Sequence, residues 1–176
     1  MRIRPADLHD LNACFALDGS YETDHVWQME YREEESAIAV QFRWVRLPRT
    51  VTVAYPPRGE SLLAHWERGE CVYVAAERRE VKGYIEVIAH PDQGLAWVEN
   101  LVVDRVYRRQ GLGTSLVAAA IQWAQMRNLE RLMIPIQSKN YPATRFCRKL
   151  GFEFCGFNDR YFANRDIALF FSRTLV

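Results

Sequence analysis

The stretch Glu99-Asn-Leu-Val-Val-Asp-Arg-Val-Tyr-Arg-Arg-Gln-Gly-Leu-Gly113 decides the fold, and the rest of the chain is organised around it. An apolar run at residues 101–103 ends at Asp104, which is the pattern of a buried strand. Residues 108–113 then open an apolar helix, and glycines at its start let the backbone approach a ligand closely. Free N–H groups and the positive end of the dipole at a helix N-terminus bind phosphate oxygens. The stretch therefore predicts a strand–turn–helix unit that holds a phosphate-bearing ligand.

The common nucleotide motifs do not fit this pair of glycines. A P-loop needs a lysine before its Ser or Thr, whereas Gly113 is followed directly by Thr114. A dinucleotide fingerprint needs a third glycine at the position where Leu116 stands. Gly-x-Gly at a helix start is also ordinary turn chemistry, so the flanking sequence must decide between these readings.

Length and composition describe one globular domain. The 176 residues can bury a sizeable core, and the chain is 49% hydrophobic and 26% charged. No apolar run reaches the length of a membrane span, and residues 1–7 lack the apolar core of a signal peptide, so we expect a cytoplasmic protein with no membrane partner. Spacings typical of metal ligands are missing, which predicts free thiols and no metal; the residues concerned are Cys14, Cys71, Cys147, Cys155, His9, His25, His65 and His90.

The formal net charge of +1 is unevenly distributed along the chain. Residues 1–98 carry 11 basic and 16 acidic side chains, whereas residues 99–176 carry 12 basic and 6 acidic ones. The asymmetry is either chance on a solvated surface, or a basic half for an anionic cofactor and an acidic half for a cationic substrate. Overall neutrality argues against nucleic acid as a partner.

The hydrophobic pattern predicts an α/β chain with a mixed sheet. It begins with an edge strand at residues 1–4 and a helix over about 5–18. Within residues 20–58, alternation predicts a half-buried strand at 38–44, a turn at 47–49 and a strand at 51–55 that pairs back as a hairpin. A loop at 56–59 and a short helix at 60–68 follow, and then three strands at 71–77, 81–89 and 96–104. Next we expect a helix at 112–127, a strand at 131–136 and a helix that starts at Ser138 or Asn140 and ends before Gly151. Two strands at 152–157 and 162–175 close the chain.

Three motifs resemble those of the GNAT superfamily of N-acetyltransferases. Arg108-x-x-Gly111-x-Gly113 resembles the acetyl-CoA signature Gln/Arg-x-x-Gly-x-Gly/Ala. Asn140-x-x-Ala143-x-x-x-Cys147-x-x-Leu150-Gly151-Phe152 resembles the Asn-x-x-Ala-x-x-x-Tyr-x-x-Leu-Gly-Phe helix, and Leu101-Val102-Val103-Asp104 is similar to the strand that splays to admit the pantetheine arm. These matches lie between about residues 96 and 157.

A narrower resemblance points to the streptothricin acetyltransferases within this superfamily. It rests on Trp123-Ala124-x-x-x-Asn128-Leu129-x-x-Leu132-Met133, on Gln137-x-x-Asn140 and on Tyr161-Phe162-Ala163-Asn164. Tyr21-Glu22 and Trp27 match more loosely. The resemblance implies a streptothricin-like subgroup and leaves the acceptor amine open.

The resemblance implies one acetyltransferase domain over residues 1–176, with a substrate-side insert at 20–58 and a cofactor-binding core at 96–157. Its fold would be a mixed, mostly antiparallel central sheet flanked by helices. Acetyl-CoA would lie in the splay beside the strand that ends near Asp104, and no metal would be needed. The residues expected to bind the cofactor are Leu101, Val102, Val103, Arg108, Arg109, Gln110, Gly111, Leu112, Gly113, Thr114, Asn140 and Cys147.

Direct acetyl transfer needs a neutral amine, a donor for the developing oxyanion and a proton for the leaving thiolate. A backbone N–H near Val103 is the expected oxyanion donor. Glu99 is the expected base, because strict alternation would place it on one face with Leu101 and Val103, and partial desolvation there would raise its pKa. The alternative is a surface glutamate paired with a neighbouring Arg or Lys.

Other side chains are expected to contact the acceptor amine. Glu86 is the second choice for the base, since a turn near Gln93 would bring it close to Glu99, where two carboxylates attract a cationic amine. The expected substrate-binding residues are Tyr21, Trp27, Tyr84, Glu86 and Trp97.

Proton donation to the thiolate is the step on which this sequence departs from the superfamily. Cys147 stands where many members carry a tyrosine, and it is either a thiol donor or a plain buried helix residue. Tyr161 is the other candidate donor.

We therefore expect an acetyl-CoA-dependent N-acetyltransferase acting on a primary amine of a small molecule, as a possible homodimer. The alternatives are a protein or peptide N-acetyltransferase and a catalytically weak CoA-binding sensor.

Overall fold

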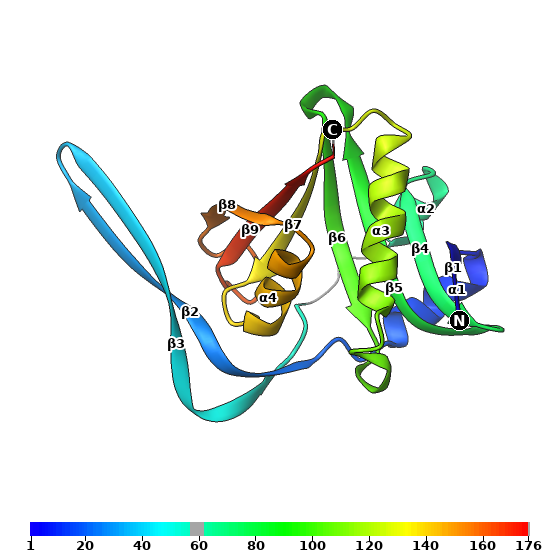
Figure 1. Ribbon diagram of the computed structural model, residues 1–176, viewed down its shortest axis with the longest axis horizontal. Helices are drawn as coiled ribbons and strands as arrows, with labels where there is room; N and C mark the ends of the chain where they lie inside the picture. Colours follow the sequence, from blue (N-terminus) through cyan, green and yellow to red (C-terminus); the bar gives the residue numbers. More distant parts are fainter. Residues whose placement is uncertain (57–61, 176) are drawn as a thin grey trace.

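The computed structural model describes residues 1–56 and 62–175 and confirms an α/β fold built on a mixed sheet (Figure 1). Within these residues, the seven-stranded sheet has the order β1-β4-β5-β6-β7-β9-β8. Every neighbouring pair is antiparallel except β6 with β7. The strand bounds are β1 Arg2–Pro5, β4 Cys71–Glu77, β5 Glu80–His90, β6 Leu95–Val103, β7 Arg131–Gln137, β8 Glu153–Asn158 and β9 Ala168–Thr174.

The parallel pair β6 and β7 is joined only at one end. Three residue pairs connect the strands, the last between Trp97 and Met133. Beyond it, β6 continues to Val103 and β7 to Gln137 without pairing to each other in the described chain. The predicted splay is therefore present, and it opens toward the start of the helix that follows β6.

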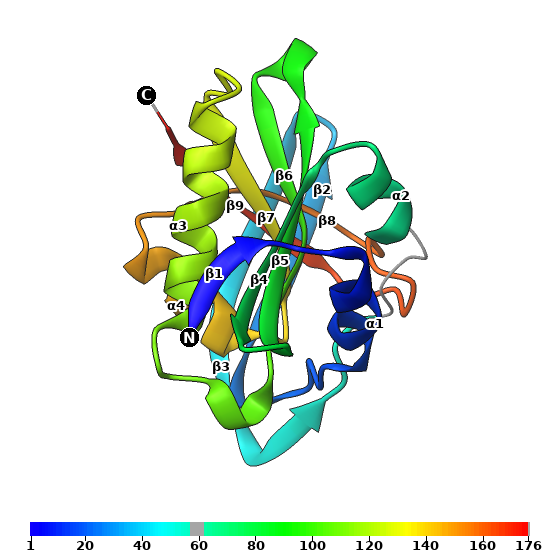
Figure 2. The same cartoon turned by 90° about the vertical axis from the view of Figure 1, so that its right-hand side faces the viewer.

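Helices cover both faces of this sheet (Figure 2). On one face, α3 (Leu112–Gln125) buries its apolar side over β4–β7. On the other, α1 (Leu8–Ala16) and α2 (Leu62–Glu67) enclose a second core with β4 and β5. The fourth helix, α4 (Tyr141–Lys149), packs Cys147 into the first core. Two short 3₁₀ helices complete the set, η1 (Pro91–Gln93) and η2 (Arg105–Tyr107).

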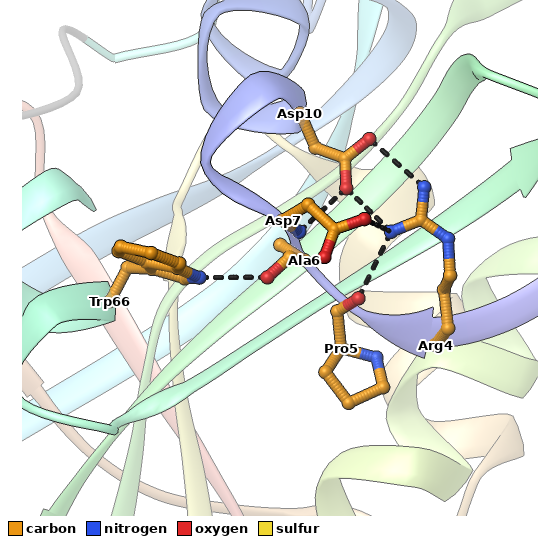
Figure 3. A network of polar contacts seen from close by, with 6 residues as sticks. All are labelled: Arg4, Pro5, Ala6, Asp7, Asp10 and Trp66. Carbon is orange, nitrogen blue, oxygen red and sulfur yellow. Dashed lines mark hydrogen bonds and ion pairs between the residues drawn. The ribbon is translucent and has the colours of Figure 1, made fainter.

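A polar network holds α1 and α2 against the N-terminal strand (Figure 3). The guanidinium of Arg4 donates to both carboxylate oxygens of Asp10, at 2.6 and 3.0 Å. The same carboxylate accepts the backbone N–H of Asp7 at 2.7 Å, which caps the start of α1. The indole N–H of Trp66, on α2, donates to the carbonyl of Ala6 at 2.7 Å. The two helices are thus fixed relative to each other and to β1.

Residues 21–53 form a long two-stranded hairpin instead of the predicted strand, turn and short hairpin. Strands β2 (Tyr21–Glu34) and β3 (Ala37–Val53) pair along their length. The predicted strand at 38–44 and the first three residues of its predicted partner at 51–55 therefore lie on the same strand, and residues 54–55 follow its end. The predicted turn at 47–49 does not reverse the chain. The register jumps from Val51 to Arg46 while β2 advances only from Thr23 to His25, so these residues form a bulge.

The remaining element predictions hold with small changes. Asn140 caps α4 by accepting the N–H of Ala143, and Gly151 follows the helix with a left-handed φ of 80°. The last strand starts at Ala168 and not at residue 162, because residues 159–167 form a loop. Of the predicted loop at 56–59 and helix at 60–68, residues 57–61 lie outside the described residues, and the helix is α2.

Candidate functional site

The start of α3 has the geometry of an anion site. Gly111 is the residue that caps the helix, with φ 85°, and a Cβ there would meet nothing within 4 Å. The first helical bond runs from the N–H of Ser115 to the carbonyl of Gly111, so the N–H groups of the first turn have no intrahelical acceptor. Arg109, Gln110 and Thr114 are exposed around them. The residues at this end of the splay fit a pyrophosphate.

Gly113 has another reason for being glycine than the one predicted. A Cβ at this position would stand 3.2 Å from Cζ of Phe146 on α4. The missing side chain therefore lets α3 and α4 approach each other beside the splay. Asn140, also expected at the cofactor, uses its side-chain oxygen to cap α4.

The side chain of Arg108 is hydrogen-bonded to the backbone of its own chain. Its guanidinium donates to three backbone carbonyls: Val103 at 2.9 Å, Ser20 at 2.6 Å and Asp18 at 3.0 Å. Partial burial lowers the pKa of this guanidinium. Arg108 thus ties the end of β6 to the segment between α1 and β2, and its expected contact with a phosphate stays a prediction.

Glu99 occupies a β-bulge, which corrects the prediction about its face. Glu86 pairs with Asn100 and Val87 pairs with Val98, so Glu99 is the extra residue of β6. Leu101 and Val103 pack against the core under α3. The charges that act on Glu99 come from the opposite face, where α2 lies, so strict alternation does not hold across the bulge.

Two causes raise the pKa of the Glu99 carboxyl above its ordinary value. Desolvation is the larger one, and the negative charge of Glu86 adds to it, while His65 and His90 act in the opposite direction. The side chain is nevertheless exposed enough to meet a ligand. A carboxylate with a raised pKa beside a splayed sheet can act as a general base.

Glu86 lies close to Glu99 as predicted, but it is closed to direct contact with an amine. Its side chain is 0% exposed. One carboxylate oxygen lies 2.5 Å from Nδ1 of His65, and the other accepts Nδ2 of Asn100 at 2.6 Å. Tyr55 extends this buried network by donating to Oδ1 of Asn100 at 3.4 Å. Glu86 therefore fixes α2, β5 and β6 around the bulge.

Tyr161 is brought to the candidate base by the loop between β8 and β9. The centroid of its ring lies 6.3 Å from that of the Trp97 ring. Desolvation raises the pKa of Tyr161, and the negative charge of Glu99 raises it further. Trp97 belongs to the last residue pair before the splay. Glu99, Trp97 and Tyr161 thus meet at the inner end of the gap.

Cys147 is 2% exposed in the core beneath α4. Burial raises the pKa of its thiol to about 12, so the thiol keeps its proton at neutral pH and is a weak acid. This favours the interpretation of Cys147 as a packing residue, and the role of Tyr161 as proton donor stays a prediction.

The other residues expected to bind the substrate make contacts within the chain itself. The hydroxyl of Tyr21 donates to Gln137 at 2.9 Å, and the amide of Gln137 donates to Asp166 at 2.9 Å, which links the start of β2 to the Tyr161 loop. Trp27 donates to Thr144 on α4 at 3.0 Å and supports the hairpin. Tyr84 is fully buried in the core under α1 and α2.

A shallow hollow of about 370 Å³ lies next to this network. Its described lining comes from the end of α1, the segment up to Ser20 and residues 54–56. Tyr55 contributes to this lining and also bonds Asn100, so the hollow adjoins the bulge. Asp18 adds a carboxylate at its edge.

Sequence reasoning missed His65, Asn100 and Tyr55. A signal existed for two members of the network: Asn100 and Glu86 are polar residues at positions of apolar strands that face a core. Such residues are hydrogen-bonded to one another when they are buried. The pairing with His65 had no local signal, because α2 is distant in sequence.

Within residues 1–56 and 62–175, no three or more His, Cys, Asp or Glu side chains form a group able to hold a metal ion. Among the same residues, no helix has both the length and the apolar character needed to cross a membrane.

The sequence pattern of the Acetyltransferase (GNAT) family matches residues 22–152. The match covers most of the chain, including the bulge, the anion site and α4, so this chain belongs to that family and is an acetyltransferase.

Two curated relatives are named as streptothricin acetyltransferases, a more specific class than the family. Streptothricin acetyltransferase of Streptomyces lavendulae is 26% identical over 159 residues, which are 87% of this chain and 82% of that protein. Streptothricin acetyltransferase A of Bacillus subtilis (strain 168) is 28% identical over 108 residues, 59% of this chain and 62% of its own length, so that match spans less than two thirds of the relative.

Solved structures share the fold over the whole chain. A nourseothricin acetyltransferase has a TM-score of 0.84 with 23% identity, covering 99% of this chain and 98% of that one. A structure from Bacillus anthracis str. Ames in complex with acetyl coenzyme A has a TM-score of 0.76 with 21% identity, covering 98% and 96%. At these identities the likeness concerns the fold alone.

Proposed function

We propose that this acetyltransferase transfers the acetyl group of acetyl-CoA to a primary amine of a small, cationic molecule of the streptothricin type. The carrying observation is that Glu99, in the β6 bulge, and Tyr161, across Trp97, lie together at the inner end of the splay. The names of the relatives from Streptomyces lavendulae and Bacillus subtilis support the choice of acceptor. The cytoplasm, which keeps thiols reduced, is the proposed compartment.

Acetyl-CoA, when bound, supplies the acetyl group as an activated thioester. The N-terminus of α3 would hold its pyrophosphate, with Arg109 close enough to add charge. Residues 101–103 of β6, which pair with β5 but not with β7, would face its pantetheine arm, and a backbone N–H near Val103 would stabilise the oxyanion.

In this mechanism, Glu99 accepts the proton that the ammonium group of the acceptor must lose. Its raised pKa makes it a better base than an ordinary surface carboxylate. Tyr161 donates a proton to the departing sulfur, and Cys147 keeps a packing role. Glu86 and His65 hold the bulge in place and touch neither substrate.

The test is a CoA-release assay with an acceptor panel of streptothricin, polyamines, aminoglycosides and short peptides. We expect saturable turnover with streptothricin and a single acetyl group added by mass spectrometry. Turnover confined to peptides would reject the small-molecule acceptor in favour of a protein N-acetyltransferase. Binding of acetyl-CoA in a thermal-shift experiment without turnover of any amine would instead identify a CoA-binding sensor.

A further inference from the structure

The loop that carries Tyr161, residues 159–167, joins β8 to β9 in an irregular conformation. All of its residues are described by the structure, and none of them lies in a helix or a strand. Arg160 and Arg165 have left-handed φ angles of 55° and 65°. Such angles are unfavourable for residues with a Cβ, and they persist where surrounding contacts hold the backbone in place. The conformation of this loop is therefore imposed by specific contacts.

The carboxylate of Asp166 makes several of these contacts. It is largely buried, with a side chain that is 11% exposed. Its Oδ1 accepts Nζ of Lys139 at 2.7 Å. Its Oδ2 accepts Nε2 of Gln137 at 2.9 Å and Nδ2 of Asn164 at 3.0 Å. Because all three partners are donors, the position needs an acceptor at both oxygens, which a carboxylate provides and an amide does not.

The backbone around Asp166 closes the loop into a compact turn. The N–H of Asp166 donates to Oδ1 of Asn164 at 3.1 Å, and its carbonyl accepts the N–H of Phe162 at 3.3 Å. The N–H of Arg165 donates to the carbonyl of Phe162 at 2.7 Å. Tyr161 directly precedes this turn, so the position of its ring depends on the same hydrogen bonds.

The loop is held at both strands of the splay. Gln137, which donates to Asp166, ends β7 and is 3% exposed, and its side-chain oxygen accepts the hydroxyl of Tyr21. On the β6 side, the ring of Tyr161 lies near Trp97, with centroids 6.3 Å apart. The buried carboxylate thus anchors the loop to the end of β7, while the phenol reaches the last residue pair that joins β6 to β7.

We propose that Asp166 is a positioning residue for acetyl transfer, which holds Tyr161 beside Glu99 by fixing the loop that carries it. The inference rests on the proposed function at one point, the donation of a proton from Tyr161 to the departing sulfur. Both carboxylate oxygens of Asp166 are engaged by its three partners, so it acts on the reaction through the loop alone. This clamp keeps the phenol in place while the thioester bond breaks.

The first test is the titration of Tyr161, followed by NMR of protein labelled with 13C at Cζ of tyrosine and assigned with Tyr161→Phe. Desolvation and the charge of Glu99 raise the pKa of Tyr161. Asp166→Asn places an amide donor against the donors of the clamp, which should release the loop, hydrate the phenol and lower this pKa toward its ordinary value. Asn164→Ala removes two hydrogen bonds of the loop without a change of charge, and it should shift the pKa in the same direction.

The matched control is Asp159→Asn, which makes the same substitution in the same loop. The carboxylate of Asp159 is 55% exposed and lies 3.9 Å from Nε of Arg160, outside the clamp. This variant should leave the pKa of Tyr161 unchanged. An unchanged pKa in Asp166→Asn and Asn164→Ala, or an equal fall in the control, would overturn the proposal.

The second test is a double-mutant cycle in kcat. Asp166→Asn should lower kcat about tenfold or more, a share of the roughly 10²-fold that a positioned acid contributes, with the KM for acetyl-CoA unchanged. In the Tyr161→Phe background it should have no further effect, because it acts through the phenol. Effects that multiply would overturn the proposal. A Tyr161→Phe enzyme with the wild-type kcat would instead refute the proposed role of Tyr161, and this result is distinguishable because the titration does not depend on turnover.

Discussion

The link made by Arg108 gives a prediction with a defined size. Replacing it by Ala removes three hydrogen bonds from a charged donor to backbone carbonyls. The segment at Asp18 is exposed, so water can replace that bond, but Val103 and Ser20 are only partly accessible. A bond to a charged group contributes about 1.5 kcal/mol or more. We therefore expect Arg108→Ala to lower the free energy of unfolding by about 3 kcal/mol.

The assay is urea unfolding at neutral pH, followed by tryptophan fluorescence, with the slope of the transition used to check that both states are comparable. Arg105→Ala is the matched control, because Arg105 lies three residues away and also reaches β2, through an exposed ion pair with Glu22. Such a pair contributes about 0–1 kcal/mol. Arg108→Lys should not rescue, since one ammonium cannot replace a planar fork. A loss for Arg108→Ala no larger than that of the control would refute the reasoning.

Three further predictions concern the cofactor loop, the base and the N-terminal network. Gly111→Ala should lower the free energy of unfolding by about 1 kcal/mol, because the φ angle of Gly111 is positive. It should also weaken acetyl-CoA binding in calorimetry, since the new Cβ projects into open space at the anion site. An unchanged affinity would reject the assignment of the cofactor to the start of α3. Glu99→Gln should lower kcat by roughly 10²-fold. In the wild type, activity should fall as pH drops through the raised pKa of Glu99; the variant should lack this step and should partly recover at high pH, where the amine loses its proton unaided. A pH–rate profile like that of the wild type would exclude Glu99 as the base. Asp10→Asn should lower the free energy of unfolding by about 2 kcal/mol at neutral pH. Burial raises the pKa of Asp10, but the hydrogen bonds from Arg4 and from the backbone of Asp7, together with the nearby positive charge, outweigh it and keep that pKa low. The wild type should therefore lose this stability as pH falls through that pKa, and a variant that kept the same acid dependence would contradict the assignment.

The strands and helices from residue 71 to residue 151 could be predicted because their local signals agree. Apolar runs, the turn at Gly94 and the caps at Asn140 and Gly151 all point to the same boundaries. The splay and the phosphate loop followed from the resemblance of the motifs around Gly111.

The hairpin and the bulge could not be predicted, for different physical reasons. Pro48 indicates a break in a strand, yet both strands of a two-stranded ribbon are edges, where proline and a bulge are tolerated. The bulge at Glu99 depends on the register between β5 and β6, which a single strand does not encode. The same limit explains why Tyr161 could be suspected but not placed. Its position depends on the loop that precedes β9.

The short pairing between β6 and β7, of only three residue pairs, links ligand binding to the stability of the fold. The two strands pair with each other at one end only, so a ligand bound in the gap would supply contacts that β6 and β7 do not make with each other. Occupancy then adds directly to folding stability, by about 2.7 kcal/mol when the free ligand is at a hundred times its Kd.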